Sequence, residues 1–103
     1  MLYGEFQEVT REDSLNISTT SKTVANVTIG NPRKTILIRN TSEDTTSVIS
    51  ISFGQKQAEN GKGIILKQNE SFSDSTSEGY TAYQGQINAI CSDANGKIAV
   101  FER

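Results

Sequence analysis

Histidine is absent from this sequence of 103 residues, and cysteine occurs only once. Without histidine, the chain lacks the commonest general base, the usual partner of a catalytic serine or cysteine, and the commonest zinc ligand. The single thiol, Cys91, excludes a disulfide within the chain. It lies between apolar and small residues, so we expect a buried, inert side chain there.

Acid–base chemistry would then fall to carboxylates, and the sequence offers no pair of them at a useful spacing. Glu43 and Asp44 are neighbours, so their side chains point apart in an extended chain. Asp74 and Glu78 flank a polar stretch that is too loose to hold two carboxylates at a working distance. We therefore expect that the protein is not an enzyme and binds no metal and no cofactor.

No stretch of the chain concentrates charge of one sign or apolar residues. The formal net charge is −2, and the lysines and arginines occur singly or in pairs, so no basic stripe could follow a phosphate backbone. No apolar run approaches the roughly 18 residues of a membrane span, and an acid stands near the N-terminus where a signal peptide needs cations. We expect synthesis in the cytoplasm without a cleaved signal, and binding to neither nucleic acid nor membranes.

Hydrophobic residues are scarce too, at 34% of the chain. Ordinary globular domains have roughly 45–50%, a figure that also counts glycine. A chain of this length forms one domain, and a small domain with a marginal core is often supported by oligomerisation. Self-association is therefore an early expectation.

What the chain does contain is a series of short segments in which apolar and polar residues alternate. Ile36 and Ile38 are expected to face inward with Leu37 opposite, and Ile49, Ile51 and Phe53 follow the same pattern. The expected strands lie at residues 14–17, 25–29, 34–40, 48–53, 64–66, near 72, 86–91 and 97–102. The spacing predicts an all-β fold, a small antiparallel β-sandwich of seven to nine short strands. We favour a jelly-roll-like sandwich, since the chain lacks the Cys/Trp/Cys pattern of immunoglobulin domains.

Two segments are expected to lie outside this pattern. Residues 73–79 are almost entirely Ser, Asp, Thr and Glu, and predict a solvated loop. Residues 1–13 are charged and irregular, and form an arm or edge segment ahead of a single domain at 14–103. The arm carries Leu2, Tyr3 and Phe6, which could contact a neighbouring molecule or fold back onto the same subunit.

The last eighteen residues contain Asn95-Gly96, the strongest short signal for a β-hairpin, because both residues tolerate the positive φ of a type I′ turn. A two-residue loop at this point would pair Cys91 with Val100 and Ile90 with Phe101. Apolar residues would then occupy both faces of the hairpin, and only one face can fill the core. We therefore expect Ile90 and Phe101 to lie in an oligomer interface.

A cluster of aromatic and amide side chains offers a different function. Tyr80, Tyr83, Gln84 and Gln86 could form a patch on which a sugar ring stacks. Alternatively, the tyrosine rings are buried at the edge of the sandwich or at a subunit boundary, with their hydroxyl groups in water. The second interpretation is the one we favour.

Residues 33–102 also carry a longer pattern of strands and turns. It comprises Ile38-Arg-Asn40, Phe53-Gly54, the turn from Gly63 through Leu66 to Asn69-Glu70, Ile87-Asn-Ala-Ile-Cys91 and Val100-Phe-Glu102. This succession resembles small virion proteins of tailed phages. Their turn usually has glycine where this chain has Asn69, and asparagine also accepts positive φ.

The resemblance implies a non-enzymatic structural protein of the virion. Such a protein would be a capsid decoration or cement protein, usually a homotrimer, that clamps neighbouring subunits of the major capsid protein. Related modules in tails and head fibres imply an alternative, the recognition of a host-surface glycan or of another virion protein. A cement protein acts through buried area and multivalency, so the arm residues would contact the capsid while Ile90 and Phe101 face the trimer.

Overall fold

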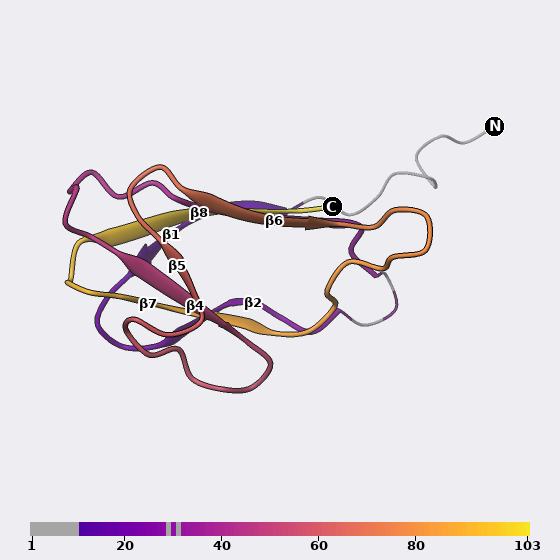
Figure 1. Cartoon of the computed structure of the whole chain (residues 1–103), viewed down its shortest axis with the longest axis horizontal. Helices are drawn as coiled ribbons and strands as arrows, with labels where there is room; N and C mark the ends of the chain where they lie inside the picture. The colour runs from indigo at the N-terminus through magenta and orange to yellow at the C-terminus, as the bar shows by residue number, and fades with distance from the viewer. Residues whose placement is uncertain (1–10, 29, 31) are drawn as a thin grey trace.

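The structure is a computed structural model that describes residues 11–28, 30 and 32–103 (Figure 1). These residues form eight β-strands and no helix, within the predicted range of seven to nine strands. The strands are β1 (Arg11–Ile17), β2 (Lys22–Ala25), β3 (Thr35–Asn40), β4 (Ile49–Phe53), β5 (Ile64–Leu66), β6 (Ser71–Ser75), β7 (Ile87–Cys91) and β8 (Gly96–Glu102).

The strands form two four-stranded antiparallel sheets that pack face to face, as Figure 1 shows. Sheet I has the order β1-β8-β3-β6, and sheet II has the order β2-β7-β4-β5. Strand β1 pairs with β8, β2 with β7, β3 with β6, and β4 with β5. This nested pairing of the first half of the chain with the second, divided between two sheets, is the jelly-roll arrangement. The predicted all-β sandwich is confirmed.

The core lies between the sheets and is built by the alternation that the sequence displays. Ile36 and Ile38 of β3 are fully buried from sheet I, and Ile49 and Ile51 of β4 are fully buried from sheet II. Leu37 points to the opposite side of β3 and is half-buried, as predicted. Buried residues from both sheets complete the cluster, including Ile17, Val24, Leu66, Ile87, Ala89, Cys91, Ile98 and Val100.

The predicted C-terminal hairpin is wrong, because β7 and β8 lie in different sheets. Cys91 pairs with Ile49 of sheet II, whereas Val100 pairs with Ile38 of sheet I. The turn at 92–95 therefore carries the chain from one sheet to the other. Inward residues of β7 and β8 face each other across the core.

Gly96 is required for close packing, and not for the type I′ turn that the Asn95-Gly96 pair predicts. Neither Asn95 nor Gly96 has a positive φ, so the turn is not type I′. A Cβ on Gly96 would lie 2.6 Å from both the Cys91 Sγ and the Ile17 carbonyl oxygen. Close packing at the start of β8, rather than turn geometry, demands glycine.

Three other segments differ from their predicted boundaries. Residues 73–79 do not form a loop throughout, because Ser71–Ser75 is strand β6 and Ser73 pairs with Leu37. Strand β2 includes a bulge and ends at Ala25, and Val27, which lies beyond this end, is 52% exposed rather than inward. Strand β1 begins at Arg11, three residues ahead of the expected start of the domain. Ile29 and the arm residues Leu2, Tyr3 and Phe6 lie outside the described residues.

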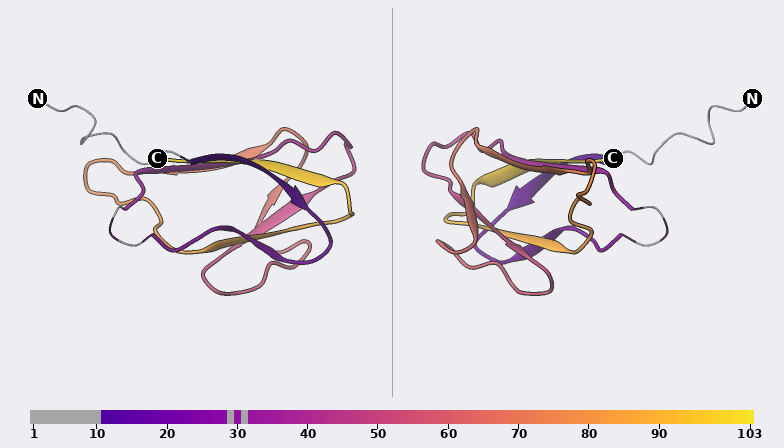
Figure 2. Two further views of the ribbon diagram at one scale, coloured as in Figure 1. Left: turned by 180° about the vertical axis from the view of Figure 1, so that it is seen from behind. Right: turned by 45° about the vertical axis from the view of Figure 1, so that its right-hand side comes forward.

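The two sheets differ in what covers their outer faces. The connection at 54–63 folds over the outside of sheet II, below β4 and β7 in Figures 1 and 2. The Asn88 side chain donates to the Lys56 carbonyl over 2.6 Å, and the Ala58 N–H donates to the Ser21 hydroxyl over 2.9 Å. Ile90, which lies on this covered face, is only 9% exposed.

Candidate interaction surfaces

A buried arginine ties the two sheets together at the end of the sandwich where β8 ends. Arg33 is 4% exposed, and its Nε donates to the Glu102 carboxylate at 2.9 Å. Its two terminal nitrogens donate to main-chain carbonyls of Asn26, Tyr83 and Gly85. Glu102 ends β8 in sheet I, whereas Asn26 follows β2 and Gly85 precedes β7 in sheet II. One guanidinium therefore joins both layers.

Glu102 accepts from a second arginine on the neighbouring strand. The Arg11 Nη1 lies 2.6 Å from Glu102 Oε1 and 2.9 Å from the Val24 carbonyl oxygen. Arg33 and Glu102 are poorly exposed, and buried charged groups are stable only when they are paired and hydrogen-bonded. The arrangement meets that condition and is an architectural tie.

Two residues of the predicted sugar patch belong to the same end and have structural partners. The Gln84 side chain accepts from the Arg33 N–H and donates to the Arg33 and Ala82 carbonyls. The Tyr83 ring packs edge-on against Phe53, with 5.3 Å between ring centroids. The Tyr83 hydroxyl donates to the Gln86 carbonyl over 3.1 Å. The Gln84 amide and the Tyr83 ring therefore serve internal packing.

Tyr80 is the exposed member of that group, at 51%. Its hydroxyl donates to both oxygens of the Asp74 carboxylate at 2.8 and 2.9 Å, and this bond raises the pKa of Tyr80 above its usual value. Asp74 also accepts from the Tyr83 N–H over 2.9 Å. Of the two tyrosines in this predicted patch, Tyr80 alone has an open ring, because the Tyr83 ring packs on Phe53.

The opposite end of the sandwich is held by a buried amide. Asn40 is fully buried; its Nδ2 donates to the Ser47 and Leu66 carbonyls, and its Oδ1 accepts from the Ser42 N–H. All three bonds are 2.9 to 3.0 Å long. One side chain therefore joins the loop after β3 to the end of β5. The nearby Asn69 has a φ of 67°, as its position in the predicted turn requires.

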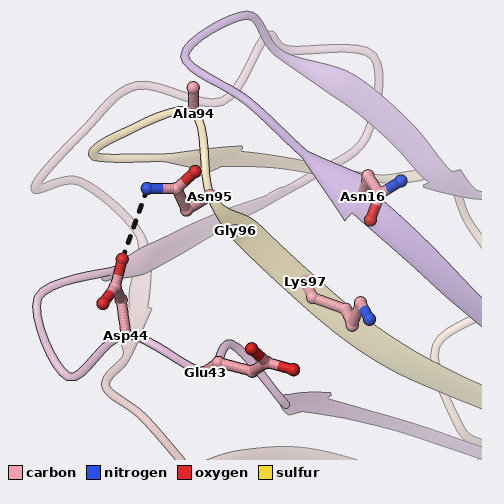
Figure 3. Close-up of a pocket in the computed structure, with 7 residues that line it drawn as sticks. All are labelled: Asn16, Glu43, Asp44, Ala94, Asn95, Gly96 and Lys97. Carbon is pink, nitrogen blue, oxygen red and sulfur yellow. Dashed lines mark hydrogen bonds between the residues drawn. The ribbon is translucent and has the colours of Figure 1, made fainter.

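A shallow hollow of about 500 Å³ opens beside this end, as Figure 3 shows. Its lining is polar and consists of Asn16, Glu43, Asp44, Ala94, Asn95, Gly96 and Lys97. The Asn95 amide donates to the Asp44 carboxylate over 3.3 Å. No group of three His, Cys, Asp or Glu side chains that could hold a metal ion occurs among the described residues.

Asp93 organises the turn that borders the hollow. Its carboxylate accepts from the Asn95 N–H at 2.9 Å and from the Ser47 hydroxyl at 2.8 Å. These two hydrogen bonds lower the pKa of Asp93 below its usual value, and the bond from Asn95 has the larger effect. Cys91 is a buried free thiol that points toward the same carboxylate, with 3.6 Å between Sγ and Oδ1. Its burial is as predicted.

Among residues 11–28, 30 and 32–103, no loop is hydrogen-bonded across the outer face of sheet I, in contrast to sheet II. Strand registers place Phe101 beside Leu37 in one row, and Ala99 beside Arg39 in the next. Serines of β6 border both rows on one side, and Glu12 and Ser14 of β1 border them on the other. Phe101 lies on this face, whereas Ile90 lies on the outside of sheet II, so the two predicted interface residues are on opposite sides of the molecule.

Neither Arg33 nor Asn40 was predicted as a site, although Asn40 belongs to the first motif of the resemblance. An arginine beside the lone proline and an asparagine at a strand end look like ordinary surface residues. Only their partners, far away in the chain, distinguish them.

Comparison with known proteins identifies no relative of this chain: no protein-family description, curated protein or solved structure matches it. Within residues 11–28, 30 and 32–103, no helix has the length and apolar character that crossing a membrane requires.

Proposed function

We propose that the protein is a non-enzymatic structural component of a phage virion, a decoration protein that self-associates and binds the assembled capsid. One observation carries the proposal: the residues on which the resemblance depends are residues that hold this jelly roll together. Glu102, which closes the resembling pattern, forms an ion pair of 2.9 Å with Arg33, a residue that stands ahead of the first motif. Asn40 ties two loops, and Asn69 adopts positive φ.

The distinctive residues of the described chain therefore serve architecture rather than chemistry. Buried side-chain hydrogen bonds hold the domain at both ends and make it rigid. A rigid surface loses little conformational entropy when it binds a partner. Such a body suits attachment to a fixed lattice of subunits, where many weak contacts act together. The arm residues Leu2, Tyr3 and Phe6 are our candidates for the capsid contact.

The test is binding of the full chain to capsid shells assembled from the major capsid protein of the same genome. We expect saturable co-sedimentation at a fixed ratio to the capsid subunit, and shells that resist heating better when the chain is bound. The full-length double variant Tyr3→Ser/Phe6→Ser should lose binding, while Val27→Ser, which removes an exposed side chain elsewhere, should retain it. No co-sedimentation, together with the absence of the chain from purified virions by mass spectrometry, would overturn the proposal.

Recognition of a host glycan is the alternative, and only the open Tyr80 ring favours it. Binding to a glycan array that Tyr80→Ala abolishes and Val27→Ser preserves would support the alternative. Because Tyr80 is exposed, its replacement leaves the core intact.

A further inference from the structure

We propose that the outer face of sheet I docks on the same face of a second copy, about a twofold axis that runs parallel to the strands between β3 and β8. The proposal deepens the self-association in the proposed function by naming the surface and the symmetry. It rests on how side chains are ordered across the four strands.

The first step is the contrast between the two outer faces. Sheet II has its own cover, since the 54–63 connection bonds to Asn88, Ser50 and Ser21. The described part of the chain provides no such hydrogen-bonded cover for sheet I, whose outer side forms the flat upper edge of the molecule in Figure 1. Phe101 and Leu37 are paired at the middle of that face on the two central strands.

The second step is the self-complementarity of the two central strands. A twofold axis between β3 and β8 places β8 of one copy over β3 of the other, with residues of the same row opposed. Phe101 then packs on the second copy's Leu37, and Ala99 lies opposite the second copy's Arg39. Each large side chain meets a smaller or an apolar one, as an isologous contact requires.

The third step concerns charge. Arg39 and Glu12 are both exposed, and Glu12 pairs with Phe101 on the β1 side of the face. In the twofold arrangement, Arg39 lies over Ala99 of the second copy. Glu12 of that copy lies close to this Ala99, on the adjacent strand β1 and in the neighbouring row, beside Phe101. The arginine can reach this carboxylate by leaning away from the axis, which also separates the two Arg39 side chains. Two symmetry-related ion pairs result.

The border of the face leaves space for these pairs. On its β6 side, Ser73 pairs with Leu37, and Ser71 pairs with Arg39. Both serines are exposed, so the reaching arginine passes over small polar side chains. A bulky residue at either position would block the approach of the second copy.

The size of the face sets the expected affinity. Four strands spaced about 4.8 Å apart, each contributing about six residues of about 3.4 Å, give a patch roughly 15–20 Å on a side. Two such patches bury roughly 600–800 Å² together, less than the roughly 1,000 Å² of a stable interface, so the contact belongs to the weak, transient class. We therefore expect a reversible dimer with a dissociation constant in the micromolar range.

The decisive experiment is sedimentation of the full chain across a micromolar concentration series, with a charge swap between Glu12 and Arg39. The wild type should shift reversibly from monomer to dimer. Glu12→Arg and Arg39→Glu should each weaken the dimer by about tenfold or more, because each opposes like charges across the contact. The double variant Glu12→Arg/Arg39→Glu should recover most of the wild-type affinity, since it rebuilds both pairs with reversed sign.

Lys56→Glu is the matched control, because it reverses an exposed charge on the loop that covers sheet II. It should leave dimerisation unchanged. A chain that stays monomeric throughout the series, a trimer, or a dimer indifferent to both single swaps would overturn the proposal. The measurement uses the purified chain alone, so a failure to bind capsid shells would overturn the proposed function without affecting this result.

Discussion

The Arg33 guanidinium and the Glu102 carboxylate meet at 2.9 Å, although 69 residues separate them in the chain. The pair joins the segment before β3 to the last residue of β8, and Arg33 also binds carbonyls that flank sheet II. Its side chain is 2% exposed, and that of Glu102 is 15% exposed. Removing Arg33 would take from the Glu102 carboxylate its more buried partner and would take one donor from each of three main-chain carbonyls.

Arg33→Met should therefore lower the free energy of unfolding by about 3 kcal/mol or more. Arg33→Lys should cost less than Arg33→Met but still be measurable, because lysine keeps the charge and loses the planar set of donors. Urea unfolding of a dilute sample measures both variants. Lys67→Met, at an exposed position, is the control and should change stability by less than about 0.5 kcal/mol. If Arg33→Met and Lys67→Met lowered the free energy of unfolding equally, Arg33 would not stabilise the contact between the sheets.

Asn40→Asp should be as damaging at the other end of the sandwich. The variant keeps the size of the side chain but turns the donor that faces the Ser47 and Leu66 carbonyls into an acceptor. We expect a loss of about 3 kcal/mol at neutral pH, since a buried charge faces two carbonyl oxygens. Asn16→Asp is the same chemical change at an exposed position, and thermal unfolding of the two variants should differ widely.

Gly96→Ala distinguishes close packing from turn geometry. Its Cβ would lie 2.6 Å from the Ile17 carbonyl oxygen, so we expect a loss of about 3 kcal/mol from overpacking. Gly79 has a φ of 78° and open space around it, so Gly79→Ala should cost only about 1 kcal/mol from backbone strain. Adding Cys91→Ala should not rescue Gly96→Ala, because the backbone contact remains. Full rescue would show that the thiol alone makes the position tight.

Asp93 should make stability depend on pH in the acid range. Its folded pKa lies below the ordinary value of 3.8, so ionised Asp93 contributes stability above pH 3.8, and this contribution is lost as the pH falls through the folded pKa. Asp93→Asn should be less stable than the wild type at neutral pH, and the gap should narrow well below pH 3.8. The urea midpoints of both proteins, measured at neutral pH and well below pH 3.8, give the difference in stability at each pH. A gap of constant size would show that the carboxylate charge does not matter.

Local alternation was enough to predict the core faces of individual strands, as at Ile36 and Ile38. It placed a strand near Phe72 but missed the continuation of β6 to Ser75, because the serines and Asp74 lack strand propensity. That strand forms because β3 offers a free edge and Phe72 can face inward, so tertiary pairing overrides propensity.

The choice of strand partner was beyond local reasoning. Asn95-Gly96 is a strong hairpin signal, yet the chain turns there from one sheet to the other, since β7 and β8 each find both neighbours elsewhere. The long separation between Arg33 and Glu102 hides their pairing in the same way. Sequence periodicity reports which face of a strand is buried, and carries no information about the strand beside it.

The nested order of strands has a mechanical consequence. Arg11 lies directly opposite Glu102, so the beginning of β1 and the end of β8 are side by side. A force that separates residues 11 and 103 would load one interstrand pair at a time and peel β1 away like a zipper, at low force. Load applied instead between the 54–63 connection and the outside of sheet I would act on the whole sandwich at once, so the direction of attachment decides how much tension the domain survives.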